Sequence, residues 1–168
     1  MLYHKMILQY FTKKENKEKS IAEDTYKYIL KKSNFFLQNN NFFIKKDYNS
    51  SFEIISILII LFIQLNIKNK VYKYKKINEY LVSFFVSDLD ESLRTKGIGD
   101  MSIGKYVKSY VKKFYFRLSI FPSDYNIQKE KLLFEYINKI NIVKEEETEN
   151  AYRKFSELYI DINNSDNS

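Results

Sequence analysis

The chain has 168 residues, a net charge of +7, and a composition that is 45% hydrophobic and 17% aromatic. This length suits a single domain with one substantial core, and the composition excludes a disordered chain. The absence of cysteine excludes disulfides, thiolate metal sites and cysteine catalysis, and a lone histidine near the N-terminus, His4, gives no basis for a catalytic triad.

The positive charge favours an anionic partner such as nucleic acid or lipid. Lys, Ile, Asn, Tyr and Phe are nevertheless abundant, whereas the chain has only three glycines, one proline and no tryptophan. This bias is typical of an A+T-rich genome. Part of the positive charge therefore reflects codon usage rather than function.

Residues 1–19 are predicted to form a flexible or interfacial N-terminal segment. Tyr3, Met6, Ile7 and Tyr10 share a helix face, and four lysines follow. This apolar patch is too short for a signal peptide. We expect a frayed end that packs on the domain in preference to an anchor on a membrane surface.

A helical domain is predicted over residues 20–162. Ser20 and Glu23 match a capping box, which predicts a helix from about Ile21 to Gln38. Three asparagines at 39–41 end this helix, and an aromatic connector around Phe42, Phe43 and Tyr48 follows.

The most apolar part of the chain runs from Phe52 to Leu65. Ser50 and Glu53 match a second capping box, which favours a helix over a strand. The run is shorter than the roughly 20 apolar residues that a membrane span needs. We therefore expect a buried helix at the centre of the core, where each large side chain contributes about 1.5–3 kcal/mol.

A pair of helices joined by an elbow is predicted over residues 82–121. The first helix ends at Gly97, where glycine allows a left-handed cap. Ser102 is the predicted cap of the second helix, and Pro122 stops it. The apolar stripes of both helices follow helical spacing: Val82, Phe85, Val86, Leu89 and Leu93 in the first, and Val107, Tyr110, Val111, Phe114, Leu118 and Phe121 in the second.

Beyond this hairpin, Ser123 or Asp124 is expected to begin a further helix. An acidic run and a last amphipathic segment follow it, and residues 163–168 are expected to be a disordered tail. The apolar positions of these two segments are Leu132, Leu133, Tyr136, Ile137, Ile140, Tyr152, Phe155 and Tyr159. The predicted fold class is therefore all-α, a single compact helical domain.

The hairpin combines an acidic helix end with a basic helix face. The acidic end has Asp88, Asp90 and Glu91. The basic face has Lys105, Lys108 and Lys112, with Lys113 and Arg117 alongside. An ordinary hairpin with solvated charges remains the alternative at this point.

No motif of the chain predicts catalysis. The segment GDMSIGK at 99–105 has the spacing of a phosphate loop, but a helix precedes it and Tyr106 stands where such a loop needs a hydroxyl residue for magnesium. Asp90 and Arg94 are predicted to form an ion pair four residues apart. Neither a metal site nor a nucleophile with a base is visible, so no enzyme and no cofactor are expected.

The hairpin resembles the ubiquinol–cytochrome c chaperone family of alphaproteobacteria and mitochondria. The resemblance spans about Ala22 to Tyr125 and is strongest from Phe85 to Arg117. It is carried by the helix FVSDLDESLR, the elbow GIGD, the helix start IGK followed by VK, and the end FYFR. Three departures from the family pattern are Phe116 in place of a glycine, and Leu58 and Gln64 in place of a histidine and an arginine.

The resemblance implies an all-α, non-catalytic assembly factor for the cytochrome bc1 complex. Its expected client is newly made cytochrome b or another subunit of that complex, and a small partner protein and the ribosome are further expected contacts. No small-molecule substrate is implied. The expected location is the cytoplasm, with peripheral contact at the cytoplasmic face of a bacterial inner membrane.

The partner-binding residues are predicted on the charged hairpin, and the two glycines are predicted to shape its elbow. The expected binding set is Asp88, Asp90, Arg94, Asp100, Lys105, Lys108, Lys112, Tyr115 and Arg117, with Gly97 and Gly99 at the elbow. Two alternatives stay open: a basic module that binds RNA or the ribosome through its lysines and tyrosines, and a purely structural scaffold.

Overall fold

The computed structural model describes residues 2–121 and 130–165. Within these residues the chain is built from α-helices and one short 3-10 helix, with no strand, and this confirms the predicted all-α class. The elements are α1 (Leu2–Asn39), α2 (Tyr48–Lys68), α3 (Tyr74–Thr95), α4 (Asp100–Ile120), α5 (Glu130–Ile140), η2 (Glu145–Glu147) and α6 (Thr148–Ser165).

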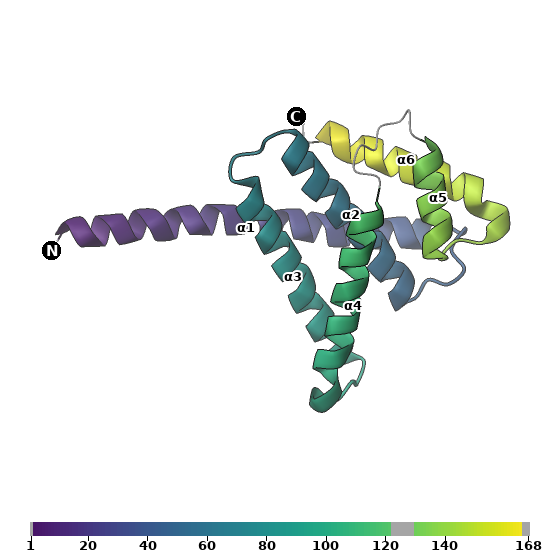
Figure 1. Cartoon of the computed structure of the whole chain (residues 1–168), viewed down its shortest axis with the longest axis horizontal. Helices are drawn as coiled ribbons and strands as arrows, with labels where there is room; N and C mark the ends of the chain where they lie inside the picture. Colours follow the sequence, from purple (N-terminus) through teal and green to yellow (C-terminus); the bar gives the residue numbers. More distant parts are fainter. Residues whose placement is uncertain (1, 122–129, 166–168) are drawn as a thin grey trace.

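Helix α2 is the centre of the core. It packs against α1, α3, α4 and α6, and Figure 1 shows it in the middle of the molecule. Ile54, Leu58 and Ile59 are fully enclosed. Helix α2 is long and apolar enough to cross a membrane, since an 18-residue stretch of it has a mean hydropathy of 2.0. However, 72% of that stretch is buried inside the protein. The prediction of a buried core helix is confirmed.

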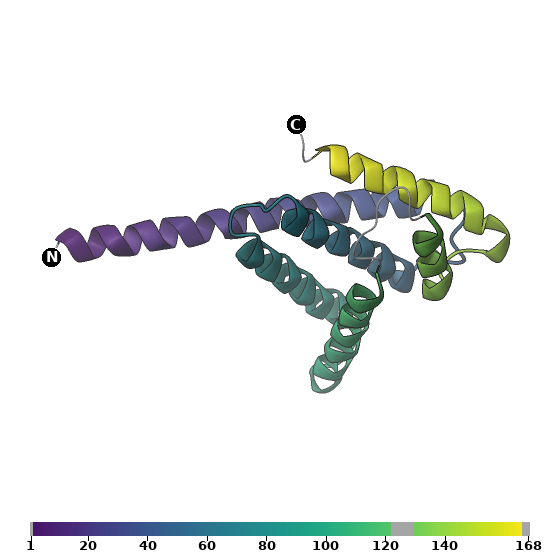
Figure 2. The same cartoon turned by 45° about the horizontal axis from the view of Figure 1, so that its top comes forward.

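Helix α1 begins far earlier than the sequence indicated. The predicted start near Ile21 is wrong, because α1 runs without interruption from Leu2, and Ser20 and Glu23 lie inside it. Glu23 pairs with Lys27 at 2.7 Å along the helix surface. Figures 1 and 2 both show the N-terminal part of α1 extending away from the other helices. The predicted flexible or interfacial character of residues 1–19 stays a prediction for a segment whose backbone is helical from Leu2.

The connector between α1 and α2 is part of the core. Phe42 and Phe43 are buried, and Phe43 forms an isolated antiparallel bridge with Val143, one hundred residues away. Asp47 caps α2 by accepting a hydrogen bond from the Ser50 backbone N–H at 3.0 Å. The second predicted capping box is therefore wrong, and the side chain of Glu53 points elsewhere.

Helices α3 and α4 form the predicted hairpin. Phe85 of α3 packs against Phe52 of α2 and Phe114 of α4, with ring centroids 5.8 and 5.1 Å apart. Helix α4 ends at Ile120, and Phe121 has the extended backbone that a residue before proline adopts. The apolar stripes of both helices face the core, as predicted, with Tyr110 partly buried against it.

Helices α5 and α6 pack against each other and close the molecule. Tyr136, Ile137 and Phe155 are buried as predicted, whereas Leu132 is 41% exposed. The predicted starts at Ser123 and Asp124, and Pro122 itself, lie outside the described residues. Helix α6 continues to Ser165, so the predicted tail is helical over its first three positions, and 166–168 lie outside the described residues.

Candidate functional site

The elbow between α3 and α4 is a glycine-dependent helix cap followed directly by a new helix. Gly97 has a φ of +83°, and the Ile98 and Gly97 backbone N–H groups donate to the Leu93 and Arg94 carbonyls at 3.3 and 2.8 Å. These two bonds form a Schellman motif. Gly99 has a φ of −66° and is the N-cap of α4, so the predicted cap at Ser102 is wrong. The elbow requires glycine at 97 but not at 99.

Gly97→Val is expected to destabilise the fold by about 1 kcal/mol or more, because a β-branched residue is forced into a left-handed conformation. Gly99→Ser is the matched control. No heavy atom lies within 4 Å of a Cβ added at 99, and serine is a better N-cap than glycine, so its unfolding free energy should not fall. Urea unfolding followed by circular dichroism measures both variants. An equal loss in both would contradict the assignment.

Three carboxylates on the acidic side of the hairpin are paired or hydrogen-bonded within the protein. Arg94 donates to Asp90 at 2.6 Å, which confirms the predicted pair, and it also contacts Asp100 across the elbow. Asp88 is half-buried and accepts a hydrogen bond from the Tyr26 hydroxyl of α1 at 2.8 Å. Burial raises the pKa of Tyr26, and the adjacent Asp88 carboxylate raises it further. These three carboxylates are therefore engaged in contacts within the fold, whereas Glu91 is exposed.

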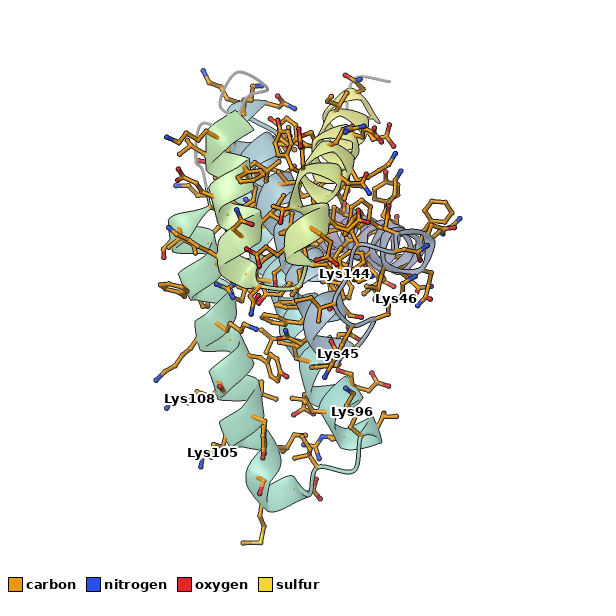
Figure 3. The ribbon with its side chains drawn as sticks, turned by 90° about the vertical axis from the view of Figure 1, so that its right-hand side faces the viewer. Lys45, Lys46, Lys96, Lys105, Lys108 and Lys144 are labelled. Atoms are coloured by element: carbon orange, nitrogen blue, oxygen red, sulfur yellow. The ribbon has the colours of Figure 1, made fainter. Side chains whose placement is uncertain are left out.

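Three lysines on the basic side of the hairpin have side chains that are free of such pairing. Lys105, Lys108 and Lys112 recur on one stripe of α4, and all three are exposed. None of them forms an ion pair or hydrogen bond with any part of the chain that the structure describes. Figure 3 shows Lys105 and Lys108 on the outer side of α4, pointing away from α3. We call these three residues the lysine stripe.

Arg117 does not belong to this exposed surface, which corrects its predicted placement. Its side chain turns inward and meets Glu53 of α2, which is 0% exposed. The Arg117 Nε and Nη2 groups each donate to a Glu53 carboxylate oxygen at 2.9 Å. Burial by itself lowers the pKa of Arg117, but the hydrogen bonds and charge of Glu53 outweigh it and leave the pKa raised. A two-point ion pair thus joins α4 to the core helix.

Lys113 extends the buried ion pair of Glu53 and Arg117 to the protein surface, and we call these three residues the buried cluster. Its Nζ lies 2.7 Å from a Glu53 oxygen and donates to Asn49 at 2.8 Å. It also sits 5.0 Å from the centre of the Phe52 ring. Beneath it, the Tyr136 hydroxyl is buried without a hydrogen-bond partner among the described residues, and burial raises its pKa. The cluster fixes α4, and with it the lysine stripe, relative to α2.

Further lysines that are distant in sequence lie beside the α2 N-terminus. Lys96 at the end of α3 places its Nζ 3.7 Å from the centre of the Tyr48 ring. Lys144 donates to the Asn41 carbonyl at 2.9 Å, which brings it to the connector that carries Lys45 and Lys46. Figure 3 shows these four lysines apart from Lys105 and Lys108, which project from the outer side of α4. Local sequence patterns carried no signal for this grouping.

Tyr115 follows Lys108 and Lys112 by seven and three residues on α4, so it shares the helix face of the lysine stripe. It is 53% exposed and borders a shallow groove of about 470 Å³ between α3, α4 and the end of α2. Its role in partner binding stays a prediction. Phe42 and Phe43 of the connector are buried, whereas Tyr48 is partly buried.

These features define a class of protein: an all-α domain with an exposed lysine stripe held on a rigid hairpin. No group of three or more acidic or histidine side chains in the described residues is arranged to hold a metal ion. No match was found among curated proteins or solved structures.

Residues 40–121 match the model of the ubiquinol-cytochrome C chaperone family. This segment contains α2, α3 and α4, and the match confirms the resemblance predicted from the sequence. The matched segment begins at residue 40 rather than near Ala22, so α1 precedes it. Both members of the buried ion pair, Glu53 and Arg117, fall within the match.

Proposed function

We propose that the protein is a non-catalytic assembly chaperone of the cytochrome bc1 complex that binds its client through the α3–α4 hairpin. The observation that carries this proposal is the family match over the three helices that build the hairpin. The client proposed is newly made cytochrome b, or another subunit of the complex, with a small partner protein and the ribosome as further contacts. The proposed location is the cytoplasm.

The lysine stripe supports this surface in preference to the acidic side. Asp90 and Asp100 already share Arg94, and a partner must break these contacts to use them. Lys105, Lys108 and Lys112 are available without any such loss. Charged groups arranged on a rigid element favour specific and rapid association with a complementary surface. We therefore assign client binding to the lysine stripe.

Loss of the protein is expected to lower the amount of assembled bc1 complex while turnover per assembled complex stays unchanged. A factor that acts before assembly changes the number of complexes, because it does not take part in their chemistry. Haem b content and ubiquinol oxidation in a deletion strain measure the two quantities. Normal abundance of the complex in that strain would exclude the proposal.

A second function, binding of RNA or the ribosome, is favoured by a separate observation. Tyr106 is 47% exposed and stands beside Lys105 on α4, as an aromatic platform for a base would. The same stripe would then contact phosphates, and binding would fall steeply with salt. Recovery of RNA without any bc1 subunit would favour this second function.

A further inference from the structure

The turn between α2 and α3 gathers the densest positive charge of the chain. Residues 54–78 contain no acidic side chain, and five lysines stand close together in this stretch: Lys68, Lys70, Lys73, Lys75 and Lys76. Lys68, Lys70 and Lys75 are exposed and unpaired within the described residues. We call these three residues the turn lysines. They lie at the opposite end of α2 from its N-terminus and the connector lysines.

Apolar side chains are exposed among these lysines. Ile67 is 50% exposed and Tyr72 is 69% exposed. Two adjoining shallow grooves, of about 490 and 470 Å³, share Tyr74 and Lys75 in their linings. A surface that alternates ammonium groups with exposed aromatic and aliphatic groups matches the boundary of an anionic bilayer, where lysines meet lipid phosphates and tyrosine rings lie at headgroup depth.

Another lysine, Lys73, holds the turn in place against α1. Lys73 has a left-handed backbone with a φ of 56°, and its Nζ pairs at 3.2 Å with Glu18, a side chain of α1 that is only 4% exposed. This contact ties the turn to α1 near the point where α1 leaves the body of the protein. Figures 1 and 2 show the turn and the extended part of α1 on the same side of the molecule.

The exposed aliphatic side chain of Ile67 favours a bilayer over RNA as the occupant of this surface. An aliphatic group offers no stacking surface for a base, whereas it can enter the apolar boundary of a membrane.

We propose that the α2–α3 turn forms a docking surface for an anionic lipid bilayer. Turn lysines contact lipid phosphates, and Ile67 and Tyr72 enter the headgroup region. This surface is separate from the lysine stripe and does not depend on the proposed client.

The test uses the purified full-length chain and lipid vesicles without protein. Vesicles of phosphatidylcholine with about 30% phosphatidylglycerol should bind the chain, and pure phosphatidylcholine vesicles should not, because surface attraction requires anionic lipid. The variant Lys68→Gln, Lys70→Asn, Lys75→Gln removes the turn lysines, and asparagine tolerates the left-handed conformation at 70. Its affinity should fall by about 100-fold, as expected for three lysines near a charged surface.

A matched control removes three other exposed lysines, with Lys31→Gln, Lys131→Gln and Lys139→Gln. It has the same net charge and should bind as tightly as the wild type. A separate variant, Ile67→Ser with Tyr72→Ser, should weaken binding even at high salt. The proposal would be overturned if the wild type bound neutral vesicles equally well or bound no vesicles at all. An equal loss of binding in the control variant would overturn it too, as would a turn variant that loses RNA binding but still binds vesicles.

Discussion

Glu53→Leu is expected to lower the free energy of unfolding by about 3–5 kcal/mol, because it leaves Arg117 buried without its carboxylate. Both hydrogen bonds of the guanidinium, each 2.9 Å long, end on Glu53. Lys113 loses the same partner but is partly exposed and can turn to solvent. Urea unfolding at neutral pH measures the change.

The double variant Glu53→Leu with Arg117→Leu distinguishes an ion pair from simple packing. Replacing both charges by apolar groups of similar size is often close to neutral, so the double variant should be more stable than Glu53→Leu alone. Asp90→Asn is the surface control, since its partner Arg94 is exposed, and it should change stability by less than about 1 kcal/mol. A double variant less stable than the single would contradict the role of the pair.

The variant Lys105→Glu, Lys108→Glu, Lys112→Glu is expected to abolish recovery of the client while leaving the fold intact. Exposed charges without partners contribute within about 0.5 kcal/mol each to stability, so the circular-dichroism spectrum and melting temperature should stay close to wild type. At an interface, like charges placed against each other cost several kcal/mol. Affinity purification of a tagged copy from a detergent extract measures the loss.

Two control variants define what such a loss means. Lys105→Arg, Lys108→Arg, Lys112→Arg keeps the charge and should retain the client. Reversal of Lys31, Lys131 and Lys139 to glutamate gives the same net charge elsewhere on the surface and should also retain it. Recovery of the client at wild-type yield by the stripe variant would move the binding surface to another part of the chain.

Local signals in the sequence were enough to predict the hairpin. Each signal lies within a short stretch of the chain: a glycine at 97, the helical spacing of Phe85 and Leu89, and the apolar run of α2. The predicted start of α1 is wrong because it, too, rested on a local signal. Ser20 and Glu23 look like a cap in a short window, but the helix-compatible residues before them let the helix continue to Leu2.

The buried half of the site was beyond local reasoning because its partners are remote in sequence. Glu53 matched a cap three residues after Ser50, whereas its partner is Arg117, sixty-four positions away. Arg117 was placed with the exposed lysines because helical spacing alone does not show which face a neighbouring helix covers. Phe43 likewise meets Val143 across one hundred residues. Only the folded structure distinguishes the exposed lysine stripe from the buried charges of Glu53 and Arg117, which fix α4 to α2.

The most direct test of the chaperone assignment is what a tagged wild-type copy brings down from the native host. Identification of the recovered proteins after mild detergent extraction, with the stripe variant treated in parallel, provides the measurement. Cytochrome b or another bc1 subunit should be recovered with the wild type and be absent with the stripe variant. Recovery of ribosomal RNA with no bc1 subunit, or of the same bc1 subunit with both proteins, would contradict the account.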